Sequence, residues 1–97
     1  MKPSDYIRRG WCREKTAKNA QGEPCHPWSL EAVAWCLEGA LRAFTEVTLG
    51  TCVLPKQQRA VLYGKVHALG FSHLADYNDA AGRTQQEVID LLVSAEL

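Results

Sequence analysis

Four cysteines and three histidines are the residues of this 97-residue chain that most readily do chemistry. A structural zinc site needs closely spaced ligand pairs, such as two cysteines two to four residues apart, so that one turn presents two thiolates. The cysteines here are far apart, at Cys12, Cys25, Cys36 and Cys52. Only His26 adjoins one of them, and two adjacent side chains seldom reach the same ion. The spacing therefore predicts no metal and no cofactor.

Cysteine catalysis needs a thiolate beside an imidazole and a third group that orients the ring. Cys12 or Cys25, with His67 or His73 and Asp79, would supply the atoms, but nothing in the spacing brings them together. The chain also contains no G-x-S-x-G, phosphate-loop or H-E-x-x-H pattern. We therefore expect a protein that is not an enzyme, with a small cysteine- or zinc-dependent protein as an alternative.

The stretch YNDAAGRTQQEV, residues 77–88, gathers Asn78, Asp79 and Arg83 beside an aromatic residue. Such a cluster could contact a partner, and these three residues are candidate contact residues. A structural reading competes with this one. Thr84 followed by Glu87 is a capping box, which starts a helix by exchanging hydrogen bonds between side chains and backbone N–H groups. Arg83 would then pair internally with Asp79 and stabilise only the bend.

Basic and aromatic residues share one face of the helix expected after Pro55. Lys56, Arg59 and Tyr63 recur at helical spacing, and such a face could hold phosphates and stack on a base. Formal net charge is zero, with 11 basic and 11 acidic residues, which disfavours nucleic acid as a partner. The same three residues are candidate contacts for a protein, and a nucleic-acid-binding module is the alternative.

Trp35 belongs to the strongest helical pattern in the sequence, which spans residues 29–50. Ser29 is a natural N-cap, Gly50 a natural end, and apolar residues recur between them at steps of three and four. By helical angle Trp35 falls among charged residues on the polar side. An exposed tryptophan there would be a typical interface anchor, although the N-terminal segment could instead fold over it.

The remaining elements follow from composition and local signals. A chain of this length supports one core, and its 46% apolar and 23% charged residues are ordinary globular values. We predict a mainly α single domain of three or four helices. Residues 1–28 would form an irregular N-terminal flap, in which the flanks of a turn at 19–22 can pair as a short β-hairpin, and residues 29–97 the helical core.

The distribution of charge and the hydropathy indicate where the protein acts and what it contacts. Residues 1–24 carry six Lys or Arg against three acids, whereas residues 73–97 carry one against five. The two ends are therefore oppositely charged, which suits either mutual proximity or orientation of a partner. No apolar run approaches the roughly 20 residues of a membrane span, and no signal peptide is visible. We expect a cytosolic monomer or small homo-oligomer with no membrane contact.

Three motifs stand out together: GWC at 10–12, AWCLEGAL at 34–41 and YNDAAGRTQQEV at 77–88. They resemble a small uncharacterised domain family of phages and bacteria. The likeness covers about residues 7 to 93, and tyrosine stands at position 77, where that family often has tryptophan. The resemblance brings no known activity, cofactor or catalytic residue. It implies an accessory protein that binds host machinery.

These observations lead to one functional expectation. The protein would act by stoichiometric binding to a host protein or protein complex in the host cytosol. An inhibitor of a bacterial defence system such as CRISPR is the form that the resemblance suggests, although a shared fold alone does not establish a function.

Overall fold

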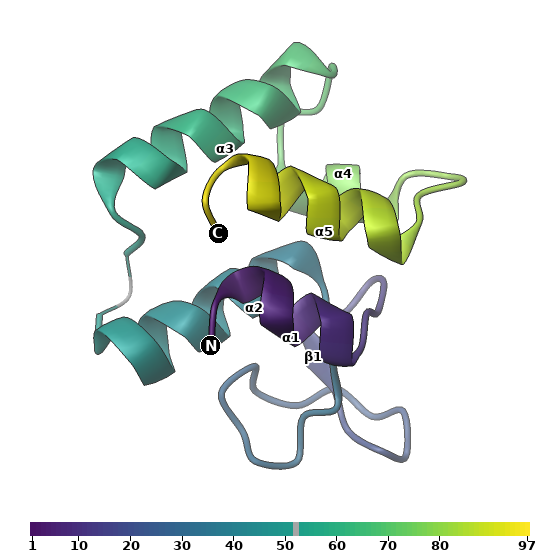
Figure 1. Cartoon of the computed structure of the whole chain (residues 1–97). Coiled ribbons are helices and arrows are strands. Elements are labelled where there is room, and N and C mark those ends of the chain that lie inside the picture. Colours follow the sequence, from purple (N-terminus) through teal and green to yellow (C-terminus); the bar gives the residue numbers. More distant parts are fainter. Residues whose placement is uncertain (52) are drawn as a thin grey trace.

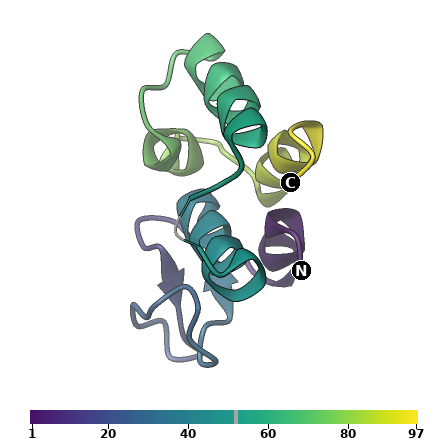
Figure 2. The ribbon, with the colours of Figure 1, turned by 90° about the vertical axis from the view of Figure 1, so that its left-hand side faces the viewer.

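Helices form two layers in the computed structural model, which describes residues 1–51 and 53–97. One layer holds α1 and α2 with a small sheet, and the other holds α3, α4 and α5 (Figures 1 and 2). The mainly α class is thereby confirmed. The helices are α1 (Pro3–Arg9), α2 (Leu37–Ala43), the π-helix η1 (Phe44–Leu49), α3 (Lys56–Ala68), α4 (Leu74–Asp79) and α5 (Gln85–Ser94). The strands are β1 (Ala17–Lys18) and β2 (Ala34–Trp35).

The N-terminal flap is folded onto the helices. Its turn forms as expected: the N–H of Gly22 donates to the carbonyl of Asn19 at 2.9 Å, and Lys18 bridges to Pro24 in antiparallel fashion. β1 nevertheless finds its main partner further along the chain, because it pairs antiparallel with β2. The irregular region expected to end at residue 28 therefore continues to the start of α2.

The two oppositely charged ends of the sequence lie together. The N–H and hydroxyl of Ser4, in α1, both donate to the carbonyl of Leu97 at 3.0 Å. α1 packs against α2 within its own layer and against α5 of the other layer (Figures 1 and 2). The expectation of mutual proximity is confirmed.

The helix predicted for residues 29–50 begins eight residues late. Its end is as expected, since Gly50 adopts φ 64°, but α2 starts only at Leu37, with Cys36 as N-cap. Ser29 caps a single tight turn, in which its hydroxyl accepts from the N–H of Glu31 at 3.1 Å. Residues 34 and 35 are extended instead of helical.

Pairing with distant backbone explains the late start. The N–H of Trp35 donates to the carbonyl of Gly10 at 3.0 Å, and the carbonyl of Trp35 accepts from Cys12 at 3.1 Å. The N–H of Cys36 donates to the carbonyl of Thr16 at 3.1 Å. Hydrogen bonds from residues 10–16 therefore replace those that a helix would make within itself. Helical propensity is a weak preference that such tertiary contacts override.

Helix boundaries that depend on neighbouring residues lie where the sequence predicts them. α3 begins directly after Pro55, whose fixed φ suits a helix start. At α5 the capping box is complete: the N–H of Glu87 donates to Thr84 Oγ1 at 3.2 Å, and the N–H of Thr84 donates to Glu87 Oε1 at 2.9 Å. The bond from the N–H of Thr84 and a second from its hydroxyl, at 3.2 Å, hold the pKa of the Glu87 carboxyl below its usual range.

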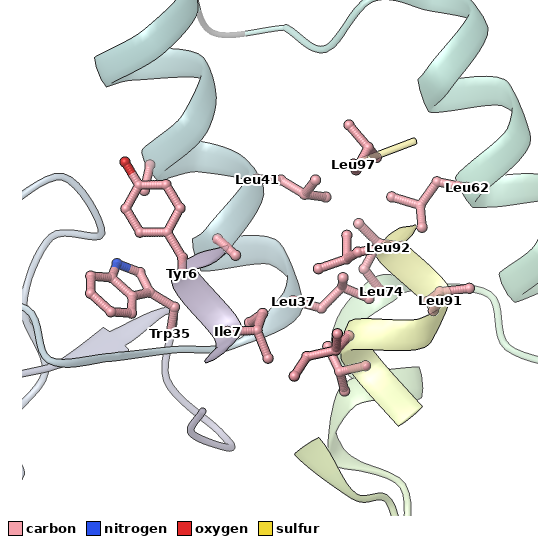
Figure 3. Packing of buried hydrophobic residues seen from close by; sticks show 14 of the residues in the cluster. Tyr6, Ile7, Trp35, Leu37, Leu41, Leu62, Leu74, Leu91, Leu92 and Leu97 are labelled. Atoms are coloured by element: carbon pink, nitrogen blue, oxygen red, sulfur yellow. The ribbon is translucent and has the colours of Figure 1, made fainter. Parts of the chain in front are cut away.

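The core lies between the two layers, and leucine is its most frequent residue. Figure 3 shows Leu37 and Leu41 of α2 facing Leu92 of α5, with Leu62 of α3 and the chain-end Leu97 beside them. All five side chains are at least nine-tenths buried. This packing ties α3 and α5 to the layer that contains α2.

At Gly39 the absence of a side chain permits a close approach of two backbone segments. A Cβ atom at Gly39 would overlap the carbonyl oxygen of Thr16, so the flap lies directly against α2. The small residues Cys36, the N-cap of α2, and Ala43 lie at helical spacing from Gly39, which suits such an approach. Gly64 differs, because a Cβ there would meet nothing within 4 Å.

We predict opposite effects for the same substitution at these two helical glycines. Gly39→Ala should lower the free energy of unfolding by about 2 kcal/mol or more, because the added methyl group forces the flap away from α2. Gly64→Ala is the matched control and should raise it by roughly 0.5 to 1 kcal/mol through helix propensity. Urea denaturation measures both. Equal effects at the two positions would contradict the close contact with Thr16.

Candidate functional site

The side chain of Asn78 is completely buried and joins three segments of the chain. Its Oδ1 accepts from Trp11 Nε1 at 2.7 Å and from the N–H of Leu37 at 3.0 Å. Its Nδ2 donates to the carbonyl of Cys12 at 3.1 Å and to Asp79 Oδ1 at 2.9 Å. The amide thereby makes four hydrogen bonds. The expectation that Asn78 contacts a partner is corrected, because its exposed fraction is 0%.

Arg83 is also held inside the protein, by contacts other than the one expected. Its Nε donates to the carbonyl of Tyr77 at 2.8 Å, and its guanidinium lies over the Tyr77 ring, 3.7 Å from the centroid. Its ion pair is with Glu87, at 3.3 Å, instead of with Asp79. Stacking on an aromatic face is a favourable use of a planar guanidinium.

Asp79 and Arg13 complete the link between this segment and the flap. Asp79 Oδ1 accepts from the N–H of Glu14 at 3.1 Å, and Glu14 has a positive φ of 66°, which few residues other than glycine adopt. Arg13 Nη2 donates to the carbonyls of Ala80 and Arg83 at 2.9 and 2.8 Å. The stretch 77–88 therefore works mainly as a clamp on residues 11–14.

Trp35 is corrected as a candidate contact residue, because its side chain is only 3% exposed. Its ring packs edge-on against that of Tyr6 at a centroid distance of 5.1 Å (Figure 3). Its Nε1 donates to the carbonyl of Pro27 at 2.8 Å. The alternative, that the N-terminal segment covers this tryptophan, is the one that the structure supports.

The exposed tryptophan is Trp28, on the loop formed by residues 25–33. It is 44% exposed and stacks on His26 with ring centroids 4.9 Å apart. Leu30, two residues on, is fully exposed at 105%. This loop projects beyond the small sheet, away from both helical layers (Figure 1).

The 25–33 loop is fixed at both ends and in its interior. The N–H of Cys25 donates to the carbonyl of Ala17 at 3.1 Å, and that of Val33 to Lys18 at 2.9 Å. A turn closes where the N–H of Ser29 donates to the carbonyl of His26 at 2.9 Å. The two prolines at 24 and 27 are the sequence signal for this loop, which the helical pattern of residues 29–50 obscured.

A cleft of about 280 Å³ separates α2 from α3 and brings two of the expected contact residues together. Arg59 and Tyr63 of α3 line it, opposite Arg42 of α2. Lys56 lies one turn earlier on α3 and is exposed outside the cleft. Of the candidate residues, Arg59 and Tyr63 therefore line a surface cleft, whereas Asn78, Asp79 and Arg83 belong to the clamp.

The described cysteines are free thiols. Burial, with a smaller contribution from neighbouring Cys36, raises the pKa of Cys12 to about 11. Burial also raises the pKa of Cys36 above its usual range, and that of Cys25. Such thiols are poor nucleophiles, because the thiolate is the reactive form. Cys52 lies outside the described residues.

Metal binding and membrane insertion find no support in the described part of the chain. Within residues 1–51 and 53–97, no three His, Cys, Asp or Glu side chains are grouped closely enough to hold a metal ion. Across the same residues, every helix is too short or too polar to cross a membrane.

Comparison with known proteins places the chain in a family. Residues 4–96 match a family of unknown function, DUF6197, and the chain belongs to it. This match confirms the expected membership of a family without an assigned function. No curated protein and no solved structure matches the chain.

We predict that Asn78→Ala lowers the free energy of unfolding by about 3 kcal/mol, because it leaves buried donors of Trp11 and Leu37 without acceptors. Asn19→Ala is the control. It also removes an acceptor of two backbone N–H groups, those of Gln21 and Glu23, but on an exposed turn where water replaces it. It should cost about 1 kcal/mol or less. Denaturant unfolding compares the two, and equal losses would contradict the clamp.

Cysteine reactivity gives a further prediction. In a Cys52→Ser background at pH 8, Cys12 should react with iodoacetamide about a hundredfold more slowly in the folded protein than in urea, because its raised pKa leaves little thiolate. Mass spectrometry of the alkylated peptides measures each site separately. A Cys12 that reacts as fast folded as unfolded would mean that its thiol is neither shielded nor protonated.

Proposed function

We propose that this protein acts by stoichiometric binding to another protein, without catalysis, and that the 25–33 loop is its main contact. The observation that carries the proposal is the exposure of Leu30 and Trp28 on a hydrogen-bonded loop. Single exposed leucines are common on protein surfaces. A fully exposed leucine beside an exposed tryptophan, at the tip of a projecting loop, is the arrangement of a contact site.

The rigidity of the loop supports this function further. Binding costs free energy when it orders side chains and backbone, and a segment already held in place avoids much of that cost. Here the stacking of Trp28 on His26 restricts the tryptophan ring before any partner arrives. The bond from Trp35 Nε1 to the carbonyl of Pro27 fixes the loop against the core.

The partner that we propose is a protein of a bacterial host. A component of a defence system such as CRISPR is the particular case, because a compact chain with an exposed apolar loop suits inhibition by occupying a surface. Zero net charge disfavours mimicry of DNA, so such an inhibitor would bind the protein surface directly. An apolar loop tip is suited to that form of contact.

We predict that Leu30→Asp weakens partner binding at least about tenfold without changing the fold, because it places a charge in an apolar contact. Leu69→Asp is the matched control, since Leu69 is also an exposed leucine, at 61%, on another part of the molecule. Tagged forms of the native chain and both variants would be used to capture proteins from a bacterial lysate. Circular dichroism checks that all three are folded.

A partner retained by the native chain and by Leu69→Asp, but lost by Leu30→Asp, is the expected result. Light scattering of the purified complex should then give a fixed stoichiometry. For the defence case, the native chain should restore plaques of a targeted phage on cells with an active CRISPR system, and Leu30→Asp should not. Equal retention by all three chains would refute the loop as the contact.

A further inference from the structure

We propose that the α2–α3 cleft binds an acidic peptide segment in which a carboxylate stands beside an apolar side chain. This second site lies on other elements than the 25–33 loop and does not depend on it. Part of its lining is apolar and buried, and part is basic and exposed. The ligand chemistry follows from these two parts.

The apolar part is formed by side chains from three separate segments. Leu41 of α2, Leu54 of the segment before α3 and Leu74 of α4 all line the cleft and are more than nine-tenths buried. Val53 adds an exposed apolar edge, at 47%. Apolar ligand groups gain most where they enter a concave site with such a floor.

The basic part consists of two arginines on opposite walls. Arg59 makes no ion pair among the described residues. Arg42 pairs with Glu38 at 3.1 Å, but the two side chains are 56% and 40% exposed, and ion pairs at such exposure contribute little. Arg42 can therefore exchange Glu38 for a ligand carboxylate. An arginine presents a planar fork that matches a carboxylate.

The charge balance favours a carboxylate over a polyphosphate chain. Arg42 and Arg59 against Glu38 leave the cleft lining with a formal charge of +1. Nucleic acid binding draws on many phosphate contacts, and Glu38 would repel the second and third phosphates. One carboxylate is the anion that this lining can neutralise.

The shape of the site favours a peptide over a compact small molecule. A second hollow, of about 260 Å³, continues the cleft along α4 and shares Glu38, Tyr63 and Leu74 with it. His73 and Ala75 line its far end. An extended chain advances about 3.3 Å per residue, so several residues can follow the two hollows. Tyr63, which lines both, can pack against an apolar side chain of that peptide.

The test is a titration of isotope-labelled native protein with the peptide acetyl-Ala-Leu-Glu-Leu-Ala-amide, followed by amide chemical shifts. Shifts should concentrate at residues that line the cleft and saturate at millimolar peptide, about 10 mM at most. The same peptide with glutamine in place of glutamate should bind about tenfold more weakly. Arg59→Gln should weaken binding of the glutamate peptide by a similar factor.

Lys65→Gln is the control variant, because Lys65 lies on α3 but lines a different hollow, between α3 and α5. It should change the affinity less than about twofold if the effect of Arg59 is specific. Saturable shifts at the cleft that need both glutamate and Arg59 support the proposal. The proposal is overturned by the absence of cleft shifts, by equal affinity of the two peptides, or by equal effects of the two variants.

The outcomes of this experiment are separate from those of the loop experiment. The pentapeptide contains no partner protein, and the Arg59 and Lys65 substitutions leave the 25–33 loop unchanged. A negative titration removes the cleft site alone. A partner lost by Leu30→Asp would still support the loop as a contact site. If no partner is captured, a positive titration would still support the cleft site.

Discussion

The buried amide of Asn78 is the interaction on which the arrangement of the flap and α2 depends. It binds the flap through Trp11 and Cys12, and the first turn of α2 through Leu37. Because the amide is fully buried, loss of its side chain would leave these groups without a hydrogen-bond partner and without water to replace it. The flap, α2 and the 77–88 stretch therefore hold one another in place.

The position of α2 follows from this constraint. Its N-terminal N–H groups need acceptors, and Leu37 finds one in Asn78 while Gly39 finds one in the sulfur of Cys36. A helix that began at Ser29 would have to give up these bonds and the strand pairing of Trp35. Burial of the Trp35 ring against Tyr6 stabilises the late start further. Residues 29–33, which the predicted helix included, instead form part of the exposed 25–33 loop.

The sequence predicted the parts of the fold that depend on neighbouring residues. The capping box of Thr84 and Glu87, the end at Gly50 and the start after Pro55 each act within one or two turns, so the chain itself carries the signal. The start of α2 could not be predicted this way, because its determinants lie at residues 10–16 and at Asn78. The periodic apolar pattern included Leu30, which the structure fully exposes.

The residues of the candidate site also differ in whether neighbouring residues or distant contacts determine their positions. Arg59 and Tyr63 were identified because helical spacing alone places them on one face, and the structure brings them to the α2–α3 cleft. Trp35 was misplaced because its environment depends on which element it occupies. Trp35 is buried, and the exposed tryptophan is Trp28, on the 25–33 loop. A contact surface of this kind can change its side chains without loss of stability, since the clamp around Asn78 and the leucine core carry the fold independently of the loop tip.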